Sequence, residues 1–197
     1  MAPDLDHSKL NKHDFDAIVT GELTHHSIWL EDAVAKFISD FFVLPELREV
    51  FNQLVLQRDG MSFQMKIEIV ESLIPFFEDE NAAKELRAAL RDVRDFKTTR
   101  NAFAHGRDVT PSDLSSPALH IQTFGRTGKE RISIVTPESH KKLTDDASKL
   151  LDRIEKLRAR IVEGEARRTN EILADLAKLF LQPRDKSGEP TASPPTD

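Results

Sequence analysis

Cysteine is absent from this 197-residue chain. Disulfide bonds, thiolate nucleophiles and cysteine-ligated zinc sites are therefore excluded, and the absence fits a reducing cytosol. An excess of positive charge is also lacking, because 28 lysines and arginines stand against 34 acidic residues, for a formal net charge of −6. Since proteins that coat nucleic acid are usually basic, broad non-specific RNA or DNA binding is disfavoured, and only a local basic site is left.

Long apolar runs and several common catalytic signatures are missing as well. The polar start, Met1 to Asp16, contains no apolar run, so we predict no signal peptide, and no segment is long enough to span a bilayer. The sequence holds no P-loop, no Rossmann glycine fingerprint and no serine nucleophile elbow. We therefore expect a soluble cytoplasmic protein that makes no membrane contact and uses no cofactor or metal.

Helical periodicity dominates the rest of the sequence. We expect residues 1–13 to be disordered, one helical domain over 14–182, and a disordered proline-rich tail over 183–197. The first expected helix runs from about Phe15 through Phe41, and Pro45 then either stops it or starts a second helix over 44–57. Further helices are expected over 62–77, 82–105 and from 137 onward. Ser62, Asn81 and the pair Thr136-Pro137 are the predicted helix starts.

A change of period marks a small β-hairpin at about 118–136. Residues 118–124 and 131–136 are typical of strands, and Gly125 to Gly128 forms the turn between them. An isolated hairpin is marginal in water, so it must pack on the helices or on another chain. Residues 107–117, which include two prolines, predict a loop.

The last helix carries an apolar seam with alternating spacings of four and three residues, made by Leu143, Ala147, Leu150, Ile154, Leu157 and Ile161. A seam of this length favours packing inside a bundle over a free coiled coil. The sequence therefore predicts an all-α fold, a bundle of four or five helices with a small hairpin before a long C-terminal helix.

The segment with the most chemical content is Arg100-Asn101-Ala102-Phe103-Ala104-His105, followed by Gly106. Arginine is a permanent cation that fits phosphate, and histidine titrates near neutral pH. Arg100 lies at the edge of the apolar stripe of its helix, and His105 is rotated from it by roughly 140°. The two point the same way only if the helix unwinds near Gly106, which we expect to take a left-handed conformation.

The charge around this segment is locally positive. Residues 84–107 hold seven cations against three acids, a net charge of +4, so the rest of the chain carries −10. A basic strip on an acidic body can concentrate an anionic ligand, although most of such a strip is ordinarily a solvated helix face. We take Lys97, Arg94 and Arg107 as candidate phosphate-binding residues beside the motif.

Arg100-Asn101-x-x-x-His105 at the end of a helix resembles the signature of the HEPN superfamily, in which a polar residue follows the arginine and a histidine lies a few residues further on. The run also resembles the Arg-Asn-x-Phe-Ala-His segment of the mannitol operon repressor family, one of several HEPN-like families. Residues 61–69 look like the segment that precedes the motif in such families. The resemblance covers about residues 61–107, and the rest of the chain only by architecture.

This resemblance implies a helical bundle that forms a homodimer, with the motifs of two protomers meeting in one cleft. It implies metal-independent RNA cleavage in which the ribose 2′-hydroxyl attacks the adjacent phosphorus and leaves a 2′,3′-cyclic phosphate. Arg100 would stabilise the phosphoryl charge, Asn101 would orient the histidine or a phosphate oxygen, and His105 would transfer the proton. Such proteins commonly serve in toxin–antitoxin or phage-defence systems, so an antitoxin or another regulatory protein is a further expected partner.

Two other hypotheses stay open. The repressor-like relatives keep the motif as regulatory or protein-interaction modules, so this chain can be a HEPN-like regulator without catalysis. The third hypothesis is a purely structural bundle in which Arg100 pairs with a buried acid.

Elsewhere, the histidines and the one tryptophan favour structural roles. His25 and His26 have no evident third ligand for a metal. Trp29 is expected in the core, whereas His120 and His140 are expected at the surface.

Overall fold

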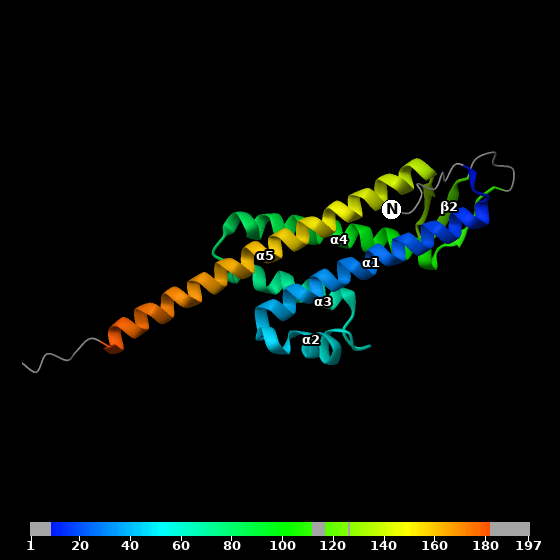
Figure 1. Cartoon of the computed structure of the whole chain (residues 1–197). Coiled ribbons are helices and arrows are strands. Elements are labelled where there is room, and N and C mark those ends of the chain that lie inside the picture. Colours follow the sequence, from blue (N-terminus) through cyan, green and yellow to red (C-terminus); the bar gives the residue numbers. More distant parts are fainter. Residues whose placement is uncertain (1–8, 112–116, 126, 182–197) are drawn as a thin grey trace, which may run out of the picture. The chain divides into compact units, whose positions relative to one another are not determined.

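A computed structural model describes residues 9–111, 117–125 and 127–181, and Figure 1 shows the arrangement of its elements. Its α-helices are α1 (Lys12–Phe42), α2 (Arg48–Phe51), α3 (Phe63–Leu73), α4 (Glu80–His105) and α5 (Pro137–Leu181). Its strands are β1 (Arg107–Asp108), β2 (Leu119–Phe124) and β3 (Glu130–Val135). The prediction of a mostly helical chain with a small hairpin before a long C-terminal helix is confirmed.

The packing divides the chain into two compact units, residues 1–162 and 163–197. The first unit contains α1 to α4, the sheet and the first part of α5, and the second contains the remainder of α5. The N-terminal helix begins at Lys12, so Lys12 and His13 are helical rather than part of a disordered N-terminus. The predicted disorder of residues 1–8 and 183–197 lies outside the described residues.

The helix starts follow from side-chain caps. The Ser62 hydroxyl accepts from the Met65 backbone N–H at 3.2 Å, and the Thr136 hydroxyl accepts from the Ser139 N–H at 3.3 Å, as predicted. The prediction of Asn81 as the cap of α4 is wrong. Asp79 caps this helix instead, because its carboxylate accepts from the Asn81 and Ala82 N–H groups and the helix begins at Glu80.

The segment predicted as one helix over 44–57 is a composite. A 3₁₀ turn (Pro45–Leu47) leads into the single turn of α2, and a π-helical stretch (Asn52–Leu56) follows. The predicted helix over 62–77 is shorter than expected, since α3 gives way to a 3₁₀ turn over Ile74–Phe76, which contains Pro75.

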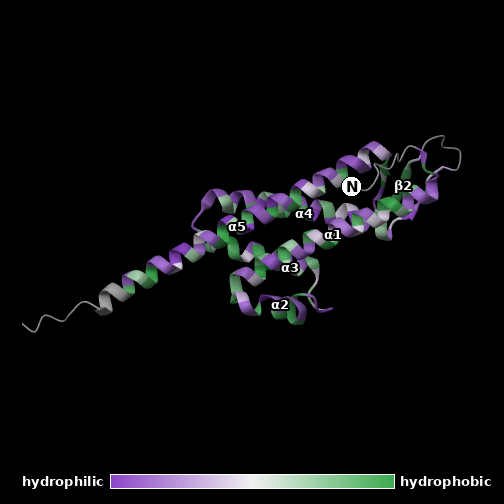
Figure 2. Cartoon of the chain, viewed as in Figure 1, coloured by the Kyte–Doolittle hydropathy of each residue, from purple (hydrophilic) through white to green (hydrophobic). Residues whose placement is uncertain are grey.

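The apolar stripes of the helices form one core in the first unit, and Figure 2 shows apolar patches recurring between polar ones along the helices. The predicted seam of α5 belongs to this core, because Ala147, Ile154 and Ile161 are all buried. The prediction that the seam packs inside a bundle is therefore confirmed. Trp29 differs from its prediction, because half of its surface is exposed.

The sheet is antiparallel with the order β1-β2-β3, and it packs on α4. Arg107 pairs with Gln122, and Leu119 with Val135. Leu119 and Ile121 are buried in the same core as the helices, so the hairpin is stabilised by the bundle. Residues 107 and 108, predicted as loop, form β1, because alignment against β2 satisfies their backbone groups.

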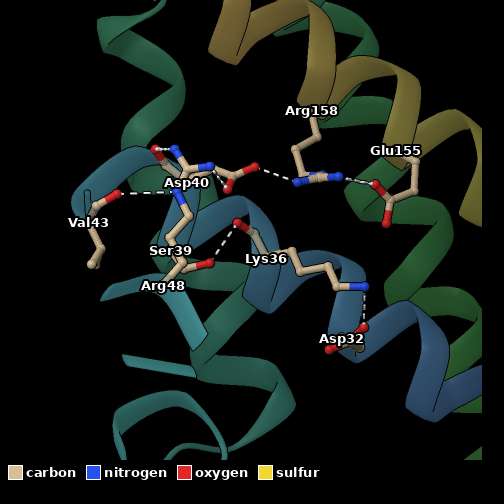
Figure 3. Close-up of polar contacts among 8 residues, drawn as sticks. All are labelled: Asp32, Lys36, Ser39, Asp40, Val43, Arg48, Glu155 and Arg158. Carbon is tan, nitrogen blue, oxygen red and sulfur yellow. Dashed lines mark hydrogen bonds and ion pairs between the residues drawn. The ribbon is translucent and has the colours of Figure 1, made fainter. Parts of the chain in front are cut away.

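Polar links tie the helices of the first unit together, and Figure 3 shows the cluster of them around Asp40. The Asp40 side chain of α1 is 9% exposed and is reached by two arginines. Arg48 lies 2.9 Å from one carboxylate oxygen, and Arg158 of α5 donates to the other. Arg158 also pairs with Glu155 at 2.7 Å. No helix in the described part of the chain is both long and apolar enough to cross a membrane.

Candidate functional site

The site lies where α4 ends against the sheet. Gly106 follows the last helical residue and has φ −75°, so the predicted left-handed conformation is wrong. Glycine is needed here for close approach instead. A Cβ on Gly106 would lie 2.2 Å from Cγ2 of Ile121 and 3.1 Å from the Gln122 carbonyl oxygen. The missing side chain lets β2 lie directly beside the end of the helix.

A groove of about 840 Å³ is open at this junction, between α4 and the β2–β3 hairpin. Its lining contains two arginines, one histidine and no acidic residue; it consists of Thr98, Asn101, Ala102, His105, Arg107, Gln122, Thr123, Phe124, Gly125 and Arg131. In a chain with a net charge of −6, a concave surface lined without carboxylates is a local positive site.

The cations of the groove are available to a ligand. No carboxylate of the described residues lies within 4.0 Å of the side-chain nitrogens of Arg107, Arg131 or His105, and all three residues are exposed. The nearest acidic residue along β1, Asp108, is held by Lys12 at 2.8 Å and by the Thr110 backbone N–H at 2.8 Å. Although partial burial opposes ionisation, these contacts lower the pKa of Asp108 to about 2.

Arg100 does not line this groove. The helix stays regular as far as His105, so Arg100 keeps its place at the edge of the apolar stripe and is half-buried. Its Nη1 donates to Oδ1 of Asn101 at 3.1 Å, and its buried Nε has no hydrogen-bond partner in the described structure. Asn101 does line the groove, one turn before His105. Arg100 is thus linked to the groove through Asn101.

The third hypothesis, a structural ion pair, expects a carboxylate at Arg100. Among the residues that the structure describes, none has a carboxylate oxygen within 4.0 Å of this guanidinium. The side chain is therefore held by an amide and by packing.

Two of the three residues predicted to flank the motif face α3 instead of the groove. Arg94 makes a two-pronged contact with the Glu71 carboxylate, and this hydrogen bonding raises the pKa of Arg94 above its ordinary value. Lys97 donates to Oε1 of Gln64 at 2.9 Å. Only Arg107 lines the groove. Arg94 and Lys97 orient α4 against α3, and we leave them out of the phosphate-binding set.

The sequence did not single out Arg131, Gln122 or Phe124 as site residues. Their places depend on the strand register, which pairs Thr123 with Arg131 and Gln122 with Arg107. The one signal in the sequence was a basic residue, Arg131, near the hairpin turn. This signal points to the site only once the hairpin is known to pack beside α4.

A second groove of about 430 Å³ lies on another face of α4, against α5. Its lining combines apolar residues and Thr99 with three aspartates, Asp92, Asp95 and Asp146, and two cations, Lys149 and Arg153. The three carboxylates outnumber the two cations, and Arg153 is already paired with Asp92 at 2.9 Å, so the groove at His105 is the better candidate for a phosphate ligand.

Two further histidines, His26 and His140, lie away from this groove. His26 stands edge-on to Trp29 with ring centroids 5.2 Å apart, and burial lowers the pKa of His26. Within residues 9–111, 117–125 and 127–181, no cluster of three or more His, Asp or Glu side chains is arranged to hold a metal ion. His140, predicted at the surface, is fully buried with its Nε2 3.3 Å from Glu22, so that prediction is wrong.

Comparison of this chain with the models of known protein families, with curated proteins and with solved structures finds no match.

Proposed function

We propose that this protein is a metal-independent endoribonuclease whose active site is the groove between α4 and the hairpin. The observation that carries the proposal is the groove itself. An exposed histidine, an asparagine and two arginines, which have no acidic partner among the described residues, line a concave surface free of carboxylates. These groups match the needs of phosphodiester cleavage, which are cations for the phosphate and a proton carrier near neutral pH.

The reaction can be written with these residues. The 2′-oxygen of a ribose attacks the adjacent phosphorus, the bond from phosphorus to the 5′-oxygen of the next nucleotide breaks, and a 2′,3′-cyclic phosphate remains. Neutral His105 takes the proton of the 2′-hydroxyl, or protonated His105 gives one to the departing 5′-oxygen. Arg107 and Arg131 stabilise the charge that develops on the phosphoryl oxygens. Asn101, whose Oδ1 is engaged by Arg100, offers its Nδ2 to a phosphate oxygen.

One histidine cannot be base and acid in the same step. We therefore propose a homodimer in which the second protomer supplies the other His105, in line with the resemblance to HEPN proteins. Sedimentation equilibrium of the full-length protein measures this state directly. A protein that is strictly monomeric and still cleaves RNA would contradict a mechanism that uses one His105 from each protomer.

The test of the nuclease proposal compares wild type with His105→Ala on single-stranded RNA in the presence of EDTA. We expect cleavage with cyclic-phosphate ends by the wild type and a loss of about 100-fold or more in the variant. His13→Ala serves as the control, because His13 is an exposed histidine on α1 and does not line the groove. Equal cleavage by wild type and His105→Ala, or no cleavage by either, would contradict the proposal.

A second function is favoured by a separate surface. Between residues 42 and 55, six large apolar side chains are exposed: Phe42, Leu44, Leu47, Val50, Leu54 and Val55. An apolar patch of this kind is typical of a protein-interaction surface, which suits a HEPN-like regulator without catalysis. Intact RNA in the cleavage assay, together with a dimer that Leu47→Asp and Leu54→Asp convert to a monomer, would favour this function.

A further inference from the structure

The hairpin forms the wall of the groove opposite the motif helix. Gln122, Thr123 and Phe124 come from the end of β2, and Arg131 comes from β3, directly across from Thr123. These residues belong to a different element from the motif and follow it by more than fifteen positions in the sequence.

Phe124 is the most unusual member of this wall. Its side chain is 65% exposed at the last position of β2, although phenylalanine is among the residues most often buried. It lines the same groove as Arg107, Arg131 and His105. An exposed aromatic ring beside cations is the combination with which proteins hold single-stranded nucleic acid, because the ring stacks on a base while the cations follow the phosphates.

Gln122, two residues before Phe124 on β2, is held in one orientation by a hydrogen bond. Nε2 of Gln122 donates to Oε1 of Glu130 at 2.8 Å, which fixes the amide and leaves its carbonyl oxygen as an acceptor at the groove. The same contact engages the carboxylate of Glu130, which pairs with Phe124 across the hairpin and precedes Arg131 in sequence. The strand register places the ring of Phe124 and the Gln122 amide on one face of the hairpin and Arg131 on the other, and all three residues line the groove at the end of the hairpin.

We propose that the β2–β3 hairpin is the base-recognition wall of the groove. In this proposal Phe124 stacks on an unpaired base next to the scissile phosphate, and Arg131 and Arg107 bind the phosphates on either side. The inference rests on the proposed nuclease function for the identity of the scissile bond, but binding can be measured without cleavage.

The geometry selects single strands. A base in a duplex is covered on both faces by its neighbours, so an aromatic ring can stack only on a base that is free of the helix. The volume of the groove, about 840 Å³, lies in the range of sites that hold small organic ligands, which fits a short segment of single-stranded RNA.

The experiment measures the affinity of the full-length protein for a short, fluorescein-labelled 2′-O-methyl RNA by fluorescence anisotropy. This probe lacks the attacking hydroxyl and cannot be cleaved by the proposed reaction. We expect Phe124→Ala to weaken binding by about 5- to 150-fold, the range for loss of one stacked base. We expect Arg131→Gln to weaken binding and to reduce the slope of log K against log salt by about 0.7. An unlabelled duplex of the same sequence should compete poorly.

Two matched controls lie outside the groove. Phe76→Ala removes a phenylalanine that is 68% exposed, and Arg91→Gln removes an exposed arginine of α4. Both should bind the probe like the wild type. Equal effects of Phe124→Ala and Phe76→Ala, equal competition by the duplex, or no binding by the wild type would overturn the inference. Binding that depends on Phe124 in a protein that leaves RNA intact would support the inference and end the nuclease proposal. RNA cleavage that is unchanged in Phe124→Ala would overturn the inference and support the nuclease proposal.

Discussion

Arg100 and Asn101 are joined by a hydrogen bond of 3.1 Å between neighbouring side chains that face different surroundings. The arginine is half-buried at the edge of the core, and the asparagine lines the groove. In the proposed nuclease site, Arg100 would therefore be a positioning residue that acts on the RNA through the Asn101 amide.

If Arg100 acts through Asn101, the two residues should be coupled in RNA cleavage. We expect Arg100→Ala and Asn101→Ala each to lower kcat/KM by about tenfold, and the double variant to be little worse than either single one, since each removes the same oriented amide. The measurement is a double-mutant cycle on kcat/KM, with the melting temperature of each variant as control. Full additivity would show that Arg100 contacts the substrate by itself, for example across a dimer interface.

The structural role of Arg100 can be tested by stability. Because the described residues place no carboxylate within 4.0 Å of its guanidinium, Arg100→Gln should lower the free energy of unfolding by only about 1 kcal/mol. Arg158→Gln is the comparison, since it removes a partner of the Asp40 side chain, which is 9% exposed. We expect Arg158→Gln to lower the free energy of unfolding by about 1–3 kcal/mol. Urea denaturation measures both values, and a larger loss for Arg100→Gln would favour the purely structural hypothesis.

Gly106 sets the distance between the motif helix and the sheet. We expect Gly106→Ala to destabilise the protein by about 1–3 kcal/mol, because the new methyl group would overlap Cγ2 of Ile121 at 2.2 Å. Gly21→Ala is the matched control. Nothing lies within 4 Å of a Cβ at this position inside α1, so the substitution should stabilise the protein by about 0.5–1 kcal/mol. Thermal denaturation compares the two, and a neutral Gly106→Ala would contradict the close approach.

The order of helices and hairpin could be predicted from the sequence because it depends on local patterns. The seam from Leu143 to Ile161 and the caps at Ser62 and Thr136 are examples, since each depends only on residues that lie close together in the sequence. The partners of long side chains could not be predicted. Arg94 reaches Glu71 on another helix, and such a contact depends on how helices pack, which no local pattern specifies.

The candidate site was predictable in part for the same reason. Asn101 and His105 are four residues apart, so a regular helix must put them on one face. Arg107 and Arg131 join them only because β1 and β3 align against β2 on either side. The expected meeting of Arg100 with His105 required the helix to unwind, whereas Gly106 is used for close packing and leaves the helix intact.

Lys66 is a cation in the core, with a side chain 5% exposed, and its Nζ contacts Glu31 of α1. We expect Glu31→Gln to destabilise the protein by about 3–5 kcal/mol, because it leaves a buried ammonium without its counter-charge. The double variant Glu31→Leu/Lys66→Met should recover most of that loss, since an apolar pair needs no compensation. Chemical denaturation of the single and double variants provides the test. If the double variant were as unstable as Glu31→Gln, the destabilisation would come from altered side-chain packing and not from the unpaired charge.

Asp108 links the N-terminus of α1 to the edge of the sheet through Lys12. Its contacts with Lys12 and Thr110 lower its pKa to about 2, against about 3.9 in an unfolded chain. Because the folded pKa is the lower of the two, the ionised carboxylate stabilises the fold above about pH 4, and this contribution disappears as the pH falls toward 2. Asp108→Asn should therefore lower the melting temperature at neutral pH, and the difference from wild type should narrow below about pH 4.

Asp59→Asn, in the exposed turn after the π-helical segment, controls for the general effect of losing one negative charge. A difference that stays constant from neutral pH into this acid range would show that the Lys12–Asp108 pair contributes nothing to stability, and that β1 is held by its backbone pairing with β2 alone.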